Sequence, residues 1–302
     1  MKISELAVLI ALGCAACGGA AQQAEPVRVT LPPPPPPSTA VAPPKPKAKP
    51  LSEAEIAFQA AFEVQRKGCD AGDAGKCNDL GISYELGHGT AVDLIKAFSA
   101  YGTACNGGSA VGCANLAALY DDGKGVAQDK ATASTLYESS CAQGASRGCN
   151  HLGLHYFYGQ GGRTVDEVKA ATLFTRACDA GDAWACTNLG YMYWKGAGVA
   201  QDYPRCVALY RTGCSGGDPS GCRNLGIQQE LGQGTALDAA AAITSYEKSC
   251  TLGGANGCYE AGRMYEIGAT GSPDYASARR LYKKGCDGGN ASACSKLPSL
   301  PP

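Results

Sequence analysis

The chain has 302 residues, of which 45% are hydrophobic, and 26 Lys and Arg against 27 Asp and Glu give a net charge of −1. A near-neutral chain lacks the basic surface with which general nucleic-acid binders neutralise phosphates, so nucleic acid is not expected as a partner. Seventeen cysteines beside three histidines do not fit a series of Cys/His zinc sites, which need ligands in close sets of four. Disulfide bonds, and with them an oxidising compartment, are the first expectation.

Residues 1–16 have the layout of a bacterial secretion signal. A lysine precedes a short apolar run at residues 6–12, which is too short to span a bilayer. Small residues stand directly before Cys17, and this arrangement resembles the lipobox of lipoproteins, in which the cysteine is lipidated. Cys14 is the alternative register, and a signal without lipid is the alternative interpretation. Because Gly18 rather than Asp follows Cys17, the resemblance implies an outer-membrane lipoprotein facing the periplasm or the surface, or otherwise a secreted protein.

Residues 17–50 form a proline-rich segment. It contains six consecutive prolines at 32–37, and Lys45, Lys47 and Lys49 alternate with proline and alanine towards its end. Such a sequence favours the extended polyproline II conformation and serves as a stiff spacer. The lysines are expected to be solvated, and contact with an anionic envelope polymer is the alternative.

Beyond this segment the cysteines expose an internal repeat. They fall into seven pairs with eight residues from the first to the second cysteine, and successive pairs lie 36, 36, 37, 36, 36 and 36 residues apart. A constant period of this size indicates a solenoid built from one repeated supersecondary unit. The pairs are Cys69 and Cys77, Cys105 and Cys113, Cys141 and Cys149, Cys178 and Cys186, Cys214 and Cys222, Cys250 and Cys258, and Cys286 and Cys294.

Each unit is predicted to hold two helices, named helix A and helix B here. Counted from the second cysteine, leucine recurs at position three, glycine or alanine at four and tyrosine at seven, which is one face of helix A. Glycine at position ten ends that helix. An aspartate then caps helix B, on which alanine, an aromatic residue and the next cysteine form one stripe. The capping aspartates are Asp93, Asp129, Asp166, Asp202, Asp238 and Asp274.

The pattern gives the boundaries of the repeat region. Residues 69–297 are expected to hold six units and a partial seventh, followed by a short tail at 298–302. Residues 51–68 are expected to form an N-terminal capping helix, with Ser52 and Glu55 placed as a capping box.

Each cysteine pair is expected to close within itself. Eight residues of continuous helix would separate two cysteines by about 12 Å, which is beyond disulfide reach. A glycine three residues after each first cysteine, such as Gly72, breaks the helix, so the end of one helix B can meet the start of the next helix A. Chain entropy for so short a loop gives about 2–3 kcal/mol per bridge.

The order Leu-Gly, Tyr, Gly-x-Gly, Asp, Ala, Tyr over 36 residues resembles Sel1-like repeats, relatives of tetratricopeptide repeats, from Ser52 to about Leu297. The resemblance implies an all-α, right-handed α/α solenoid of helix pairs, with one intra-pair disulfide per repeat. Because every unit has a cysteine pair, the resemblance is more specifically to the Helicobacter cysteine-rich proteins. This group often carries a β-lactamase-like name. Gln229, Ala261 and the turn at 268–273 depart from the pattern, so unit six is expected to be irregular.

No catalytic constellation is visible, and the catalytic residues stay unknown. Ser245 and Lys248 match the Ser-x-x-Lys element of serine β-lactamases, but the Ser-Asp-Asn and Lys-Thr-Gly elements are absent. His151 and His155 stand four residues apart, yet the third histidine lies two units away, so no metal site is predicted. Cys206 occupies an alanine position of helix B and is expected to be a buried, unreactive thiol. No cofactor is expected.

The strongest functional signal lies on the face of helix A opposite its core stripe. Positions one, two, five, eight and nine after the second cysteine share that face, which lines the concave binding surface of tandem-helix solenoids. In units three and four these positions hold aromatic and amide side chains suited to a peptide or a ring-shaped ligand. Packing against adjacent helices is the alternative. The candidate residues are Asn150, His151, Phe157, Tyr158, Asn188, Tyr191, Trp194 and Lys195.

The sequence therefore predicts a monomeric scaffold of the cell envelope that holds an envelope protein or peptide on its concave face. A lipid anchor at Cys17 would attach it to the membrane. The resemblance also implies the alternative, a β-lactam-binding protein with weak β-lactamase activity, whose ligand would be a β-lactam or a peptidoglycan-like molecule.

Overall fold

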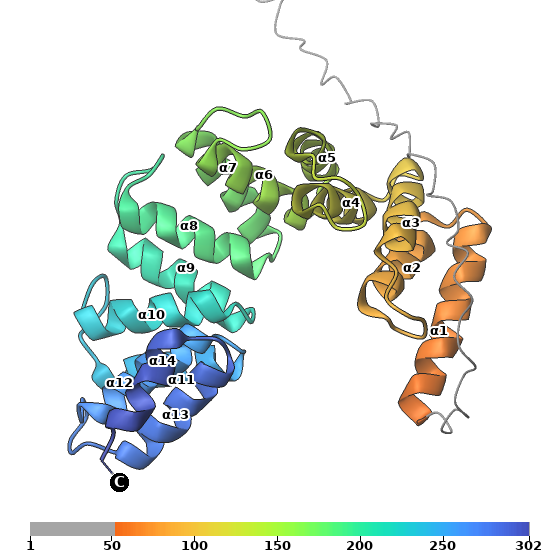
Figure 1. Cartoon of the computed structure of the whole chain (residues 1–302). Coiled ribbons are helices and arrows are strands. Elements are labelled where there is room, and N and C mark those ends of the chain that lie inside the picture. Colours follow the sequence, from red (N-terminus) through yellow and green to blue (C-terminus); the bar gives the residue numbers. More distant parts are fainter. Residues whose placement is uncertain (1–51, 302) are drawn as a thin grey trace, which may run out of the picture.

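The computed structural model describes residues 52–301, which form fourteen α-helices and one short 3-10 helix and contain no strand. Figure 1 shows these helices stacked one after another along a curved path from α1 to α14. The predicted right-handed α/α solenoid is confirmed. The signal at 1–16, the proline-rich segment at 17–50 and both candidate lipidated cysteines, Cys14 and Cys17, lie outside the described residues.

Helix α1 (Glu53–Asp70) precedes six A/B pairs, and α14 (Ala291–Lys296) with the 3-10 helix η1 (Leu297–Ser299) closes the stack. The A helices are α2 (Ala74–Leu86), α4 (Ala110–Asp122), α6 (Ser146–Tyr158), α8 (Ala183–Lys195), α10 (Pro219–Leu231) and α12 (Ala255–Glu266). The B helices are α3 (Leu94–Asn106), α5 (Lys130–Ala142), α7 (Glu167–Asp179), α9 (Tyr203–Ser215), α11 (Ala239–Thr251) and α13 (Tyr275–Asp287).

The helices begin at hydrogen-bonded caps. Each of the six predicted aspartates accepts a hydrogen bond from a backbone N–H in the first turn of helix B, which satisfies a donor that the helix start leaves free. A second set of side-chain caps begins four of the A helices and α14, at the fourth residue before the second cysteine. The sequence pattern did not predict this second set, because Ala145 and Gly254 interrupt it.

The helix ends follow the glycine pattern except in unit six. In units one to five the glycine at position ten is a left-handed C-cap, with φ between 65° and 76°. In unit six, α12 ends one residue earlier, its C-cap Ile267 is right-handed, and the positive φ values of Gly268 and Gly271 shape the turn instead. The irregularity expected of unit six is therefore present in this turn.

Helix α1 has the predicted capping box, with Ser52 and Glu55 exchanging hydrogen bonds. It extends beyond the predicted residue 68 to Asp70, so that Cys69 lies in its last turn. The chain turns only at Gly72, which has a φ of 89°. The helix thus ends where the glycine allows the turn rather than where the cysteine stands.

The core lies between the A and B helices, where each aromatic ring of helix B packs on a small residue of helix A. A Cβ atom at Gly153 would lie 2.7 Å from the ring of Phe174, and one at Gly226 would lie 2.6 Å from the ring of Tyr246. Glycine is needed there because the two helices approach so closely. Tyr246, like its equivalents in the other units, is fully buried.

All seven predicted disulfides are present, with Cα atoms 4.3 to 4.6 Å apart. Each joins the end of α1 or of a helix B to the next A helix or to α14, so that every junction between consecutive units is covalently closed. The bonded pairs are Cys69 with Cys77, Cys105 with Cys113, Cys141 with Cys149, Cys178 with Cys186, Cys214 with Cys222, Cys250 with Cys258, and Cys286 with Cys294.

Cys206 is the free cysteine within residues 52–301. It is buried against Val207, Tyr210 and Leu225, as its place among the alanine positions of helix B predicts. Burial raises the pKa of its thiol to about 12, so the reactive thiolate is scarce near neutral pH.

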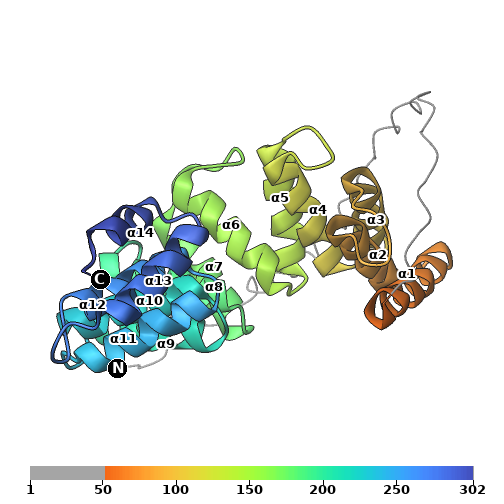
Figure 2. The ribbon, with the colours of Figure 1, turned by 60° about the horizontal axis from the view of Figure 1, so that its bottom comes forward.

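The A helices pack side by side along the inner side of the curve. Close contact joins α2 to α4, α4 to α6, α8 to α10 and α10 to α12, whereas consecutive B helices touch less closely, α11 and α13 the most among them. The backbones of α6 and α8 come less close together than those of the other neighbouring A helices, beside the unit whose turn at 159–165 holds the extra residue of the 37-residue spacing. Figure 2 shows the same succession of helices after a turn of 60°.

None of the helices in residues 52–301 combines the length and the apolar content needed to cross a bilayer.

Candidate binding groove on the concave face

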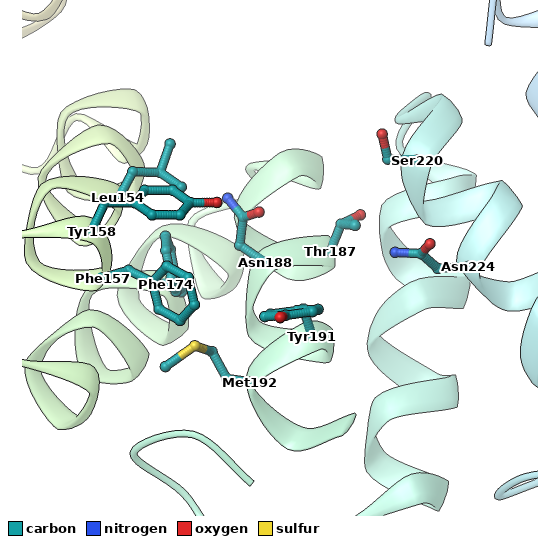
Figure 3. A pocket seen from close by; sticks show the side chains of 10 residues that line it. All are labelled: Leu154, Phe157, Tyr158, Phe174, Thr187, Asn188, Tyr191, Met192, Ser220 and Asn224. Carbon is teal, nitrogen blue, oxygen red and sulfur yellow. The ribbon is translucent and has the colours of Figure 1, made fainter. Parts of the chain in front are cut away.

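Two adjacent hollows flank Tyr191 on the inner helices. The first encloses about 220 Å³ between α6, α8 and α10 (Figure 3), and its lining includes Leu154, Phe157, Tyr158, Asn188, Tyr191 and Asn224. The second encloses about 280 Å³ between α8 and α10, and its lining includes Tyr191, Trp194, Tyr210, Ile227, Gln228 and Leu231. The first lies between α6 and α8 and the second on the other side of Tyr191, and together they are called the groove below.

Five of the eight candidate residues line this groove, and they come from positions two, five, eight and nine of units three and four. They are Phe157, Tyr158, Asn188, Tyr191 and Trp194. In Figure 3 the side chains from α6 and those from α8 converge on the space between the two helices.

The aromatic side chains form a continuous row across α6 and α8. Phe157 meets Tyr158 and Tyr191 edge-on, with ring centroids 4.9 and 6.0 Å apart, and Tyr191 lies 5.7 Å from Trp194. Tyr158 is 61% exposed, Tyr191 37% and Trp194 39%, whereas Phe157 is half-buried and packs against the core. These four residues are called the aromatic row, and only Phe157 contributes to the core as well.

The other three candidate residues support the groove from outside it. Asn150 is buried, and its side-chain oxygen accepts a hydrogen bond of 2.9 Å from Asn188. His151 stacks on Tyr137 with centroids 4.8 Å apart, and burial lowers the pKa of His151, which favours its neutral form.

Lys195 is exposed and does not line either hollow. Its Nζ atom lies 3.3 Å from Glu167 and 5.4 Å from the centre of the Phe157 ring. Because both partners of the ion pair are largely in water, the pair adds little stability.

Unit five supplies the far wall of the groove, which the sequence analysis did not assign. Asn224, Ile227 and Leu231 occupy positions two, five and nine of that unit, so the same helical pattern would have found them. Gln228 lies outside the pattern. It is only 3% exposed, and its Oε1 atom is buried without a hydrogen-bond partner among the described residues.

The residue at position eight of helix A differs between the outer units, which are one, five and six, and the central units, which are three and four. In units one, five and six it is a glutamate that accepts a hydrogen bond from the buried tyrosine hydroxyl of helix B. In units three and four it is Phe157 or Trp194. The hydrogen-bonded pairs are Tyr101 with Glu85, Tyr246 with Glu230 and Tyr282 with Glu266.

Unit two has an intermediate arrangement at this position. Asp121 replaces the glutamate, and its Oδ2 atom lies 3.2 Å from Nε2 of the buried His155. The hydroxyl of Tyr137, the other oxygen of Asp121 and Nδ1 of His155 have no hydrogen-bond partner within residues 52–301. The shorter aspartate therefore bonds to the histidine and leaves the tyrosine unpaired.

The groups considered for catalysis or metal binding are used structurally. Ser245 is buried, and its hydroxyl donates a hydrogen bond of 2.7 Å to Oε1 of Gln229. His155 faces Asp121, whereas His151 stacks on Tyr137. In the described part of the chain, no group of three or more His, Cys, Asp or Glu side chains is placed to hold a metal ion.

Comparison with protein families gives a match that covers more than half of the chain. The Sel1 repeat family matches five stretches, at residues 77–109, 110–144, 146–182, 185–218 and 255–290. The interval between the last two stretches contains most of unit five, in which Gln229 replaces the usual tyrosine. None of the curated proteins matches the chain.

Solved structures with the same architecture include two of similar sequence. Protein c5321, a protective antigen present in uropathogenic Escherichia coli strains, is 28% identical over 80% of this chain and 51% of that chain, with a TM-score of 0.63. This chain thus spans about half the length of c5321. A Sel1 repeat protein from Oxalobacter formigenes is 26% identical over 75% of this chain and 99% of that chain, with a TM-score of 0.66.

The cysteine-rich protein B of Helicobacter pylori is 26% identical over 43% of this chain and 93% of that chain. Its TM-score is 0.36, so the comparison carries no argument about the function of the groove.

Proposed function

The chain belongs to the Sel1 repeat family, and from that premise we propose that it is an extracytoplasmic scaffold whose groove holds an extended peptide segment of a partner protein. Repeat solenoids of this type use their concave surface for protein binding. The seven disulfides support a location in an oxidising compartment outside the cytoplasm.

The observation that carries the proposal is the exposure of Tyr158, Tyr191 and Trp194 in one row above two hollows. Tyrosine and tryptophan at the centre of a protein interface contribute much of the binding free energy, because they bury a large apolar area and keep a polar atom for a hydrogen bond. In the folded chain these rings leave a substantial part of that area in water. A partner that covers these rings would bury that apolar area and gain the corresponding binding free energy.

The shape of the groove favours a peptide over a compact small molecule. The hollows, at 220 and 280 Å³, are each smaller than a typical ligand pocket of about 300–1,000 Å³. Side chains of one extended peptide can enter both, while the amides of Asn188 and Asn224, which line the first hollow, offer hydrogen bonds to its backbone.

The lipid anchor at Cys17 is the second part of the proposal. A lipidated Cys17 followed by the segment at 17–50 would hold the solenoid away from an outer-membrane surface. Metabolic labelling with palmitate is expected to mark the wild-type protein and the Cys14→Ala variant but not Cys17→Ala. Equal labelling of both variants would remove Cys17 as the anchor.

Selection from a displayed peptide library against the full chain tests the binding proposal. Peptides that bind the wild type are expected to lose at least about 30-fold in affinity for Trp194→Ala and for Tyr191→Ala, as for residues at an interface centre. The matched control is Trp184→Ala, because Trp184 is also on α8 and 57% exposed but lies outside the groove. Peptides that bind Trp194→Ala as tightly as the wild type would place the binding surface elsewhere.

Hydrolysis of a chromogenic cephalosporin is the competing prediction from the sequence resemblance. The scaffold proposal expects the purified full chain to give the same rate as a heat-inactivated control. Turnover clearly above that control would favour the β-lactamase alternative instead.

A further inference from the structure

The groove offers donors to a ligand rich in hydrogen-bond acceptors. The indole N–H of Trp194 and the hydroxyls of Tyr158 and Tyr191 belong to exposed side chains of the aromatic row. The hydrogen bond that Trp194 makes within residues 52–301 uses its backbone carbonyl, which accepts from Gln201, so the indole N–H remains available.

A run of prolines matches this surface. Proline has no N–H, so in a polyproline II helix every carbonyl oxygen is free to accept a hydrogen bond from a neighbouring surface. Its rings are apolar and its conformation is already restricted, which is why proline-rich segments dock in grooves lined by aromatic side chains. The aromatic row provides both the rings and the donors that such a segment needs.

The chain itself contains such a run at residues 32–37. We propose that these six prolines occupy the groove of the same chain, where they compete with a partner. The inference rests on the proposed function in that it assigns the same groove an occupant, and it adds regulation of access to that groove.

The length of the intervening segment is sufficient. Residue 37 is fifteen residues from Ser52 at the start of α1, and polyproline II extends about 3.1 Å per residue, or about 46 Å in all. Packed helices lie about 8–10 Å apart, so the four steps from α1 through α2, α4 and α6 to α8 span about 40 Å. The prolines can therefore reach the aromatic row from the beginning of the solenoid.

The lysines of the segment and the carboxylates of the concave face occur in the same order relative to the prolines and the aromatic row. Lys45, Lys47 and Lys49 lie between the prolines and α1, and would pass units one and two. There, positions two, eight and nine of helix A hold the carboxylates Asp79, Glu85, Asp121 and Asp122, before the aromatic positions of units three and four. Lys76 and Lys124 pair with Asp79 and Asp122, but exposed pairs of this kind exchange partners at little cost.

The second hollow suits the residues that precede the prolines. It lies one inner helix further from α1, and its lining includes Ile227 and Leu231. Leu31 stands directly before the six prolines. Its side chain suits the apolar wall that Ile227 and Leu231 form.

Quenching of Trp194 fluorescence by acrylamide tests this occupancy in the full chain. The chain has two tryptophans, so Trp184→Phe makes Trp194 the sole reporter. Replacement of all six prolines at 32–37 by serine in that background is expected to raise the Stern–Volmer constant at least twofold, because the ring loses its cover. Equal quenching with prolines and with serines would overturn the inference.

A synthetic peptide of residues 28–50 provides the second arm. Added to the serine variant, it is expected to restore the lower quenching, whereas the same peptide with six serines is not. Protection by the chain's own prolines should not change on dilution; protection that disappears on dilution would assign the prolines to a second copy and overturn the same-chain proposal. If neither the prolines nor the peptide protects Trp194 while library-selected peptides still require it, this inference fails and the proposed function stands.

Discussion

Units one, five and six share their architecture with units three and four but use one position differently. In both regions an aspartate caps helix B and a disulfide joins consecutive units. At position eight of helix A, the outer units place a glutamate that bonds to a buried tyrosine, whereas the central units place Phe157 and Trp194. In unit three the helix B ring is Phe174, which has no hydroxyl to satisfy. In unit three, position eight is therefore released from this structural role because its partner needs no acceptor, whereas in unit four Trp194 stands there although the helix B ring is Tyr210.

The largest effect is expected from the buried ring of an outer unit. Tyr246→Ala should reduce the free energy of unfolding by about 3–5 kcal/mol, because it removes a fully buried aromatic side chain that packs on Gly226. Denaturant titration followed by circular dichroism measures the change. A loss below about 1 kcal/mol would show that the outer units do not depend on this packing. It would contradict the structural role that the comparison gives to the buried tyrosine.

Loss of the outer carboxylate should cost less than loss of the ring. Glu230→Ala leaves the Tyr246 hydroxyl and the Arg263 guanidinium without the oxygen atoms that they contact at 2.7–2.8 Å. We expect a destabilisation of about 1–3 kcal/mol, measured in the same titration. The matched variant Glu230→Gln keeps an acceptor for the hydroxyl and should lose less; equal losses in both variants would assign the effect to Arg263 alone.

Unit two can be given the glutamate that the outer units have at position eight, which tests the comparison more closely. Asp121→Glu adds the methylene that the aspartate lacks, so its carboxylate can reach the unpaired Tyr137 hydroxyl as Glu85 reaches Tyr101. The expected gain is about 0.5–1.5 kcal/mol, the net value of one buried hydrogen bond, again by denaturant titration. A loss of stability would mean that the contact between Asp121 and His155 is worth more than the new one.

The thiol of Cys206 reports whether the core below the aromatic row is as closed as in the outer units. Because burial raises its pKa from 9.0 to about 12, the thiolate fraction at pH 9 is about a thousandth in the folded chain and about one half in the unfolded chain. Iodoacetamide at pH 9 should therefore modify Cys206 only after denaturation. Rapid alkylation of the native protein would indicate that unit four opens.

The repeat and its disulfides could be predicted from the sequence because their signals are local and recur along the chain. The period of the cysteine pairs, the glycine after each first cysteine and the capping aspartates each correspond to one backbone requirement. The irregular turn after α12 could also be predicted, because a proline follows Gly268 there.

The groove could be predicted only in part, because its walls come from different units. Helical periodicity placed Tyr191 and Trp194 on the inner face, but it could not show that the backbones of α6 and α8 lie further apart there than those of other neighbouring A helices. It also could not show that His151 is covered by Tyr137 of the preceding helix B. Gln228 faces the second hollow from a position outside the inner-face pattern, so no periodic signal identifies it.

Thermal unfolding of the double variant Tyr191→Ala with Trp194→Ala tests the central claim, that these exposed rings serve binding and not folding. Surface substitutions change stability by about 0.5 kcal/mol or less, so the account predicts a midpoint within about 2 °C of the wild type. Phe157 is left intact because it also packs against the core. A drop as large as that of Tyr246→Ala would show that Tyr191 and Trp194 are core residues, and would contradict the account.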